Sequence, residues 1–250
     1  MPGVTMPPEE AAAADHRHHG RLLDDRRRAG IYAMLLLAAF VFMLLGVGKH
    51  PTELAPMTTI TAIGRLDANL YDAIVPHRND VLTAVFKLFD VTGKGLVTIP
   101  LRIVLLGVLL IRRRWAAGVA FALTWATSEI AIEVLKTSFM RGRPPLPLVT
   151  TVGYSFPSGH ATAGAAIGVS IVLAFLRPGH RRRIWIGLAL LLAFTMAFSR
   201  VYLGAHWLSD VETGVLLGSV CAVASFAIVD VIRHRALRPP EPLHEGHVAG

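Results

Sequence analysis

Long runs of apolar residues, separated by short polar stretches, make up most of the chain between residues 31 and 232. Six of these runs approach the roughly 20 residues that an α-helix needs to cross a hydrocarbon core of ~30 Å. The pattern therefore predicts an all-α integral membrane protein built as a bundle of six transmembrane helices. We place the six spans at 31–48, 95–111, 115–135, 160–176, 184–199 and 211–232.

The first apolar run and the chain ends define the predicted domain boundaries. The first run is uncharged and follows Arg26 to Arg28, as in a signal peptide, but no small-residue cleavage site follows it, so a retained helix is preferred. Residues 1–30 are rich in Ala, Pro, His and Arg without apolar periodicity, which predicts a disordered tail. Residues 233–250 form a second tail, and 31–232 is expected to be one membrane domain.

Clusters of arginine occur in every second connection between the apolar runs. They lie at 26–28, 112–114, 177–183 and 233–238. Because short cytoplasmic loops of membrane proteins are enriched in Lys and Arg, we expect all four clusters on the cytoplasmic side. Both termini are then cytoplasmic. The segments that face outward are 49–94, 136–159 and 200–210.

The long outer segment contains a shorter element with one apolar face. In VLTAVFKLFDVTG, residues 81–93, the side chains of Val81, Val85, Leu88 and Phe89 fall on one side of a helix. We expect a short amphipathic helix that lies at the membrane surface.

Composition and charge support the same class of protein. The sequence is 53% hydrophobic and only 17% charged, which leaves too little polar surface for a soluble domain of this length. The pI of about 10.4 raises the question of nucleic acid, but the basic residues flank apolar runs, so no nucleic-acid partner is expected. A single cysteine, Cys221, excludes an internal disulfide and a cysteine-rich metal site.

The outer stretch YSFPSGH, residues 154–160, leads directly into the fourth span. Pro157 disfavours helix before it, Ser158 is a typical N-cap residue, and Gly159 lets the backbone approach a ligand. A helix that begins near His160 points its free N–H groups and positive dipole end outward, which favours an anion. An ordinary capped helix with a histidine at its start is an equally good interpretation of this stretch alone.

A second outer stretch, SRVYLGAHWLSD, places His206 and Asp210 four residues apart. On a helix the two side chains share one face, within contact distance. A carboxylate on one imidazole nitrogen fixes the tautomer and leaves the other nitrogen free as a nucleophile. A purely structural His–Asp pair is the alternative. A metal site is disfavoured because no third and fourth ligand occur at suitable spacing.

The third outer stretch, KTSFMRGRPP, begins at residue 136. Lys136 closes the third span, and Pro144 keeps the chain extended after Arg143. With Arg141 and Arg200, these cations lie on the side that the charge bias disfavours. Binding an anion would explain them. Contact with lipid headgroups is the alternative for any one of them alone.

Together the three stretches resemble the three signature motifs of the type 2 phosphatidic acid phosphatase (PAP2) superfamily. The first motif, K-x6-R-P, is matched by Lys136, Arg143 and Pro144. The second, P-S-G-H, is matched by residues 157–160, and the third, S-R-x5-H-x3-D, by Ser199, Arg200, His206 and Asp210. Every motif position is present, in order and with unbroken spacing.

The resemblance implies a role for each residue. His206 would attack phosphorus to give a phosphohistidine, Asp210 would orient it, and His160 would protonate the leaving oxygen and then activate water. The phosphate oxygens would be bound by Lys136, Arg143, Arg200, the Ser158 hydroxyl and the Gly159 N–H. Because fixed cations and a helix N-terminus can stabilise the transferring phosphoryl group, we expect no metal and no other cofactor.

The resemblance also implies a bacterial lipid phosphatase in the inner (plasma) membrane, with its active site on the extracytoplasmic face. Its substrate would be a membrane lipid phosphate: polyprenyl pyrophosphate, phosphatidylglycerol phosphate or phosphatidic acid. A phosphotransferase that uses a lipid or sugar hydroxyl as acceptor is one alternative. A transporter or membrane scaffold with an incidental anion site is another. Vanadate binding, as in the related haloperoxidases, is disfavoured because those proteins are soluble.

Overall fold

The protein is all-helical wherever its structure, a computed structural model, is described, namely over residues 26–47 and 62–236. These residues contain eight α-helices and a 3-10 turn, η1 (Val75–His77), and no strand. The α-helices are α2 (Arg26–Val47), α3 (Ala62–Ile74), α4 (Asp80–Thr92), α5 (Gly95–Ile111), α6 (Trp115–Phe139), α7 (Gly159–Phe175), α8 (His180–Tyr202) and α9 (Leu208–Ala236).

Each of the six apolar runs coincides with a helix, in the order α2, α5, α6, α7, α8 and α9, although residue 48 lies outside the described residues and residue 176 follows the end of α7. Three of these, α6, α8 and α9, are by themselves long and apolar enough to cross a membrane. A fourth span is obtained if α4 and α5, which are bent by 43° at their junction, count as one. The apolar part of α2 and the whole of α7 are shorter. The all-helical prediction is thus confirmed for the described residues, and three to four candidate spans by length and composition agree with a membrane protein. The count of six spans remains a prediction.

Two predicted boundaries differ from the structure. Helix α2 begins at Arg26, so residues 26–30 of the predicted N-terminal tail are helical, and α9 continues to Ala236. The apolar pattern marks only the stretch that is hydrophobic, whereas a helix continues through polar residues for as long as its backbone hydrogen bonds are made. The rest of the two predicted tails, residues 1–25 and 237–250, lies outside the described residues.

The segment predicted to face outward, where it is described from residue 62 to 94, holds more structure than its sequence pattern predicts. Helix α3 has no counterpart among the predictions. The predicted amphipathic helix is present as α4, which begins at Asp80 because the Asn79 side chain accepts a hydrogen bond from Leu82 N at 2.9 Å. It continues into α5 after a bend at Gly93 and Lys94. Its location at a membrane surface remains a prediction.

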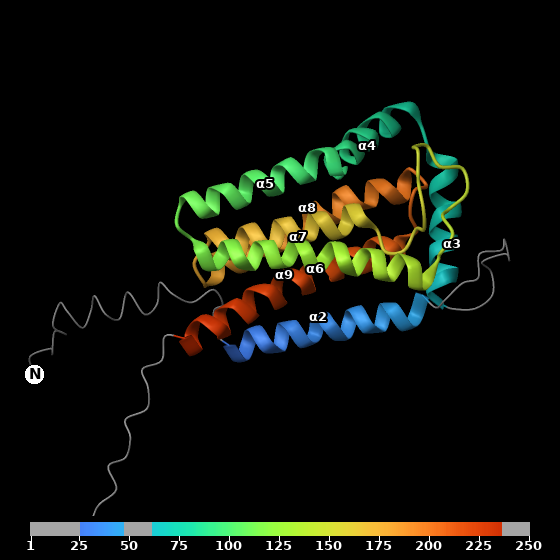
Figure 1. Cartoon of the computed structure of the whole chain (residues 1–250). Helices are drawn as coiled ribbons and strands as arrows, with labels where there is room; N and C mark the ends of the chain where they lie inside the picture. The colour runs from blue at the N-terminus through green and yellow to red at the C-terminus, as the bar shows by residue number, and fades with distance from the viewer. Residues whose placement is uncertain (1–25, 48–61, 237–250) are drawn as a thin grey trace, which may run out of the picture.

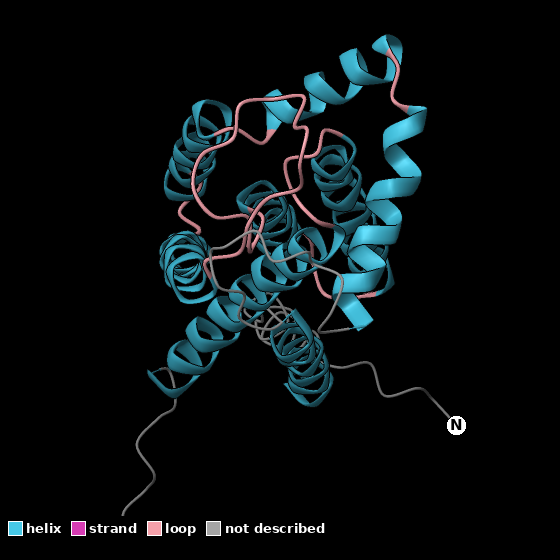
Figure 2. Ribbon diagram, turned by 90° about the vertical axis from the view of Figure 1, so that its right-hand side faces the viewer, coloured by secondary structure: helices cyan, strands magenta, loops and turns pink. Residues whose placement is uncertain are grey.

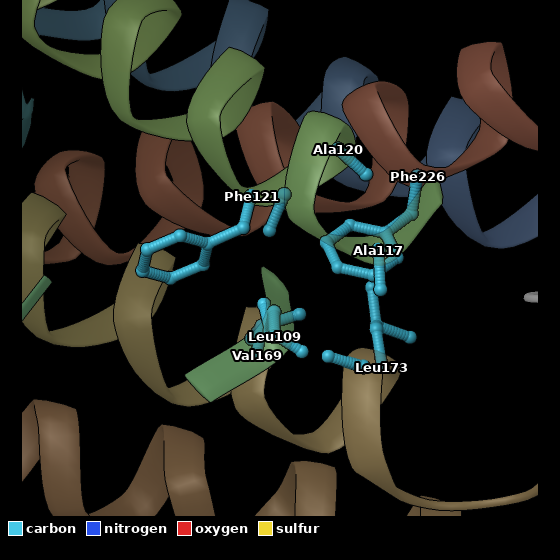
Figure 3. Close-up of a cluster of buried hydrophobic side chains, with 9 residues drawn as sticks. Leu109, Ala117, Ala120, Phe121, Val169, Leu173 and Phe226 are labelled. Carbon is cyan, nitrogen blue, oxygen red and sulfur yellow. The ribbon is translucent and has the colours of Figure 1, made fainter. Parts of the chain in front are cut away.

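Close packing between α7 and α9 forms the centre of the bundle. A Cβ atom added to Gly214 would lie 2.7 Å from the Ser158 carbonyl oxygen, and one added to Gly218 would lie 2.3 Å from the Thr162 carbonyl oxygen. The two backbones can therefore touch only because both positions lack a side chain. A buried apolar cluster from α5, α6, α7 and α9 includes Leu109, Phe121 and Phe226 (Figure 3) and lies near the connection between α5 and α6.

One end of the bundle is closed by polar segments. Helix α3 runs across this end, and the loop between α6 and α7 folds over it (Figures 1 and 2). The C-terminal ends of α6 and α8 and the N-terminal ends of α7 and α9 meet here, because consecutive helices run in opposite directions (Figure 1). All three predicted motifs therefore lie at the same end.

Candidate active site

The imidazole of His206 lies in the turn between α8 and α9, not on a helix as its spacing from Asp210 predicts. The Nδ1 atom is 2.7 Å from the Ser155 carbonyl oxygen, and Nε2 is 3.4 Å from Nη1 of Arg143. A carbonyl oxygen only accepts hydrogen bonds, so Nδ1 carries the proton and Nε2 keeps its lone pair. An unprotonated Nε2 is what attack on phosphorus requires, and the guanidinium beside it can stabilise charge on the phosphoryl oxygens.

Asp210 is a more distant partner of His206 than the sequence predicts. Its Oδ2 atom is 3.6 Å from the Nδ1 atom of His206 and accepts a hydrogen bond from Trp207 N at 2.9 Å. The carbonyl of Ser155 is the nearer acceptor. A main-chain carbonyl has no sequence signature, so only the fold of the loop could identify it. Asp210 adds negative charge behind the ring and holds the turn that carries it.

Burial governs the protonation of His206, whose side chain is only 4% exposed. Burial lowers the pKa of His206 from 6.5 to about 4, with Arg143 and Arg200 acting in the same direction and Asp210 opposing it. The imidazole is therefore neutral at neutral pH, which is the state that can attack phosphorus.

Arg143 is held rigidly, as the following proline predicts. Its guanidinium donates hydrogen bonds to four main-chain carbonyls, at 2.7 to 3.0 Å, of Val152, Gly153, Tyr154 and Ala205. Burial lowers the pKa of Arg143 from its ordinary value, and the charge of Asp210 partly offsets this. Arg143 thereby ties the loop before α7 to the turn that carries His206 and presents a fixed positive charge at Nε2.

Ser158 occupies the N-cap position of α7, but its hydroxyl makes no capping hydrogen bond. Among the described residues, the buried Oγ atom has no hydrogen-bond partner at all. An unsatisfied buried hydroxyl costs ~1–3 kcal/mol, so its persistence needs a reason. The main-chain N–H of Ser158 donates to the Asp210 carbonyl at 3.0 Å, which joins the second motif to the third. The hydroxyl and the N-terminus of α7, with Gly159 as its first residue, are suited to a phosphate oxygen.

Arg200 and His160 meet at Asp90, a buried residue of α4 that the sequence analysis did not single out. Arg200, in the last turn of α8, forms an ion pair with its carboxylate. The Nε2 atom of His160 is 3.4 Å from Oδ1 of Asp90 and 3.1 Å from its carbonyl oxygen. The ammonium group of Lys136, in the last turn of α6, lies within electrostatic reach of His160 but makes no hydrogen bond or ion pair with a described side chain or carbonyl.

A buried network that the sequence analysis missed supports Asp210 from behind. Arg141 donates to Oδ1 of Asp210 at 2.6 Å and to Oδ2 of Asp67, on α3, at 2.7 Å. Ser209 N donates to Oδ1 of Asp67 at 2.9 Å. Burial opposes the charge of Arg141, but the carboxylates of Asp210 and Asp67 outweigh it and raise the pKa of the guanidinium. Nothing in the sequence distinguishes Asp67 from a solvated acid.

The charges that face His206 come from protein groups. Across residues 26–47 and 62–236, no three His, Cys, Asp or Glu side chains are grouped so that they could hold a metal ion. Stabilisation of an anion beside His206 would fall to Arg143, to Arg200 and to the N-terminus of α7. Independence from metal ions remains a prediction that an assay must test.

Comparison with known proteins places the chain in a family. Residues 117–233 match the PAP2 superfamily. Phosphatidylglycerophosphatase B of Bacillus subtilis is 33% identical over 151 residues, which cover 57% of this chain and 71% of the relative. The chain belongs to the PAP2 superfamily. An undecaprenyl-diphosphatase of Sulfolobus acidocaldarius is 31% identical over 169 residues, covering 65% of this PAP2 protein and 78% of the relative.

A solved structure has the same PAP2 fold. The crystal structure of a transmembrane PAP2-type phosphatidylglycerolphosphate phosphatase from Bacillus subtilis superposes with a TM-score of 0.64 at 24% identity. The alignment covers 84% of this chain and 98% of that one. The region that matches the superfamily contains all three motifs, whereas Asp67 and Asp90 precede it.

Proposed function

We propose that this PAP2 protein is an integral membrane phosphatase that hydrolyses a phosphate or diphosphate ester of a lipid through a phosphohistidine at His206. The observation that carries the proposal is the geometry of that imidazole. Its Nδ1 proton is directed at the Ser155 carbonyl, and its Nε2 lone pair lies 3.4 Å from the fixed guanidinium of Arg143. The two relatives named above are a phosphatidylglycerophosphatase and an undecaprenyl-diphosphatase, which supports a lipid as the substrate.

In the first step, Nε2 of His206 attacks phosphorus and forms an N–P bond. The bond from phosphorus to the leaving oxygen breaks, and its electron pair departs with that oxygen, which takes a proton from His160. For a monoester the leaving group is a lipid alcohol, and for a diphosphate it is a lipid monophosphate. Arg143, Arg200, Lys136, the Ser158 hydroxyl and the Gly159 N–H hold the phosphoryl oxygens.

In the second step, the neutral His160 removes a proton from water as the water oxygen attacks phosphorus. The N–P bond breaks, its electrons return to Nε2, and inorganic phosphate leaves. Negative charge on the three phosphoryl oxygens is the main demand in both steps, and fixed cations meet it without rearrangement. Lowering of the His206 pKa to about 4 keeps the nucleophile neutral in the resting protein.

The proposed topology follows from the helices and the arginine clusters. All six apolar helices cross the membrane in this proposal, with α2 and α7 as the short ones. The arginine clusters at 112–114 and 177–183 lie at the end opposite to the motifs, which fits a cytoplasmic location for them and for both termini. The site then opens on the extracytoplasmic side of a bacterial inner membrane, where a lipid phosphate can approach from the bilayer.

The proposal is tested by phosphate release from purified protein in detergent. Phosphatidic acid, phosphatidylglycerol phosphate and a polyprenyl pyrophosphate are compared, with and without EDTA. His206→Asn should abolish release. His77→Asn is the matched control, because His77, in the predicted outer segment 49–94, is an exposed imidazole whose Nδ1 contacts only the carbonyl of Ala73, at 2.9 Å. Turnover by His206→Asn at the wild-type rate would refute the mechanism.

Two further readouts separate the alternatives. Rapid quenching in alkaline detergent, in which the N–P bond of a phosphohistidine survives, should trap label from ³²P-labelled substrate on wild-type protein and none on His206→Asn. A phosphotransferase would pass that label to an added lipid or sugar acceptor instead of water. A transporter would move the lipid across liposome membranes without releasing phosphate. Release that persists in EDTA would establish the predicted independence from metal.

A further inference from the structure

Asp90 places a buried carboxylate among three basic side chains at the motif end of the bundle. It lies in the last turn of α4, and its side chain is only 3% exposed. Arg200, from α8, pairs with Oδ1. The same oxygen is 3.4 Å from Nε2 of His160, from α7, and Oδ2 is 3.2 Å from Nζ of Lys94.

Two of these three partners have roles in the proposed mechanism, Arg200 as a phosphate ligand and His160 as the acid and base. Arg200 and His160 come from different motifs and different helices, yet they meet at one carboxylate oxygen. The Nη1 atom of Arg200 is engaged by Asp90, while its buried Nε has no hydrogen-bond partner in the part of the chain that the structure describes. A phosphate oxygen that reached this guanidinium would therefore lie close to the negative charge of the Asp90 carboxylate.

The helix break before α5 fixes Asp90 in this place. A Cβ atom added to Gly93 would lie 2.2 Å from Cδ2 of His160, so only a glycine permits the bend to pack against the ring. The carbonyl oxygen of Asp90 is also 3.1 Å from Nε2 of His160. Backbone and side chain of this last turn are thus both fitted to the motif residues, which distinguishes Asp90 from an acid that happens to lie nearby.

We propose that Asp90 is an internal anion that competes with the phosphate group for Arg200. Carboxylate and phosphate both accept hydrogen bonds from a guanidinium, and two anions repel each other strongly in a buried site. Asp90 therefore weakens the binding of free phosphate and favours departure of the product after each turnover. The inference rests on the proposed function in one respect, namely that Arg200 is a phosphate ligand.

The competition is measured by calorimetric titration of the purified full chain in detergent. Inorganic phosphate and vanadate are titrated separately, and the affinity for each anion is compared between variants. Asp90→Asn keeps the size of the side chain and removes its charge, and it should bind both anions roughly tenfold more tightly. Asp80→Asn is the matched control, because it removes an exposed carboxylate from the first turn of the same helix. Its affinity for both anions should equal that of the wild type.

A double-mutant cycle tests whether the effect acts through Arg200. In an Arg200→Met background, Asp90→Asn should give no gain in anion affinity. A gain that persists without Arg200 would overturn the competition. So would equal or weaker binding by Asp90→Asn, which would make Asp90 an anchor for Arg200 and His160.

A second neutral variant guards against a folding defect. Asp90→Ser is compared with Asp90→Asn by thermal unfolding, and tighter anion binding by either folded variant supports the proposal. Loss of structure in both variants, without tighter binding, overturns it. These titrations need no turnover, so they separate the inference from the proposed function. If the Asp90 variants bind phosphate more tightly but the wild type hydrolyses no lipid phosphate, the competition by Asp90 stands and the phosphatase assignment is rejected.

Discussion

Replacing Arg141 by methionine should destabilise the protein strongly, because it would leave two buried carboxylates without a cation. The guanidinium side chain is 2% exposed, and its carboxylate partners, Asp67 and Asp210, are 1% and 0% exposed. Breaking one buried ion pair by removing a partner costs about 3–5 kcal/mol, and here one substitution removes the partner of both acids. We therefore expect a loss near the upper end of that range.

The prediction is tested by thermal unfolding in detergent with a ranked set of variants. A loss of about 5 kcal/mol corresponds to a fall of roughly 10–20 °C in the midpoint for a chain of this size. Asp67→Asn should cost far less, because it changes the formal charge of the cluster from −1 (one cation, two anions) to zero and keeps the pair between Arg141 and Asp210. Arg65→Met, at an exposed position on α3, is the control and should unfold like the wild type.

Two results would refute this reasoning. One is an Arg141→Met variant with the midpoint of the wild type, which would mean that the two acids are solvated or protonated at no cost. The other is a larger loss in Asp67→Asn than in Arg141→Met. That order would show that the hydrogen bonds of Asp67 to Ser209, and not the charge of Arg141, hold the network together.

Three further predictions follow from individual contacts. The pKa of His206 is about 4 in the folded protein and about 6.5 in the unfolded chain, so between these values the unfolded chain binds the proton more readily. The free energy of unfolding therefore decreases as the pH is lowered from about 6.5 to about 4. The loss approaches ~3 kcal/mol near pH 4, so the unfolding midpoint should fall more between pH 7 and pH 4 in the wild type than in His206→Asn; equal pH profiles would contradict the burial argument. Ser158→Ala should lower kcat/KM for phosphate release about 100-fold without lowering the unfolding midpoint, because the hydroxyl has no partner within the described chain; a lower midpoint would assign the hydroxyl to the fold. Gly214→Ala should reduce kcat by displacing the Ser158 carbonyl, whereas Gly187→Ala, where a Cβ meets no atom within 4 Å, should not, and equal kcat values would show that the α7–α9 contact can relax.

The sequence alone determined the helical membrane class and the three motifs. Hydrophobic runs of this length are stable only as helices in a bilayer, where every backbone polar group needs an internal partner. The helix start after Ser158 is equally local, because the effect of Pro157 on the backbone acts within a few residues. The spacing of Lys136, Arg143, His206 and Asp210 could likewise be read directly along the chain.

Only the tertiary structure decided which groups surround those motifs. Asp67 and Asp90 lie in the outer segment before α5, where an acidic residue is usually solvated, and both are buried against arginines far along the chain. The carbonyl of Ser155, the nearest partner of His206, is a backbone atom that every residue possesses. Charge pairing across 74 or 110 positions depends on how the helices pack, and no local preference of the sequence encodes it.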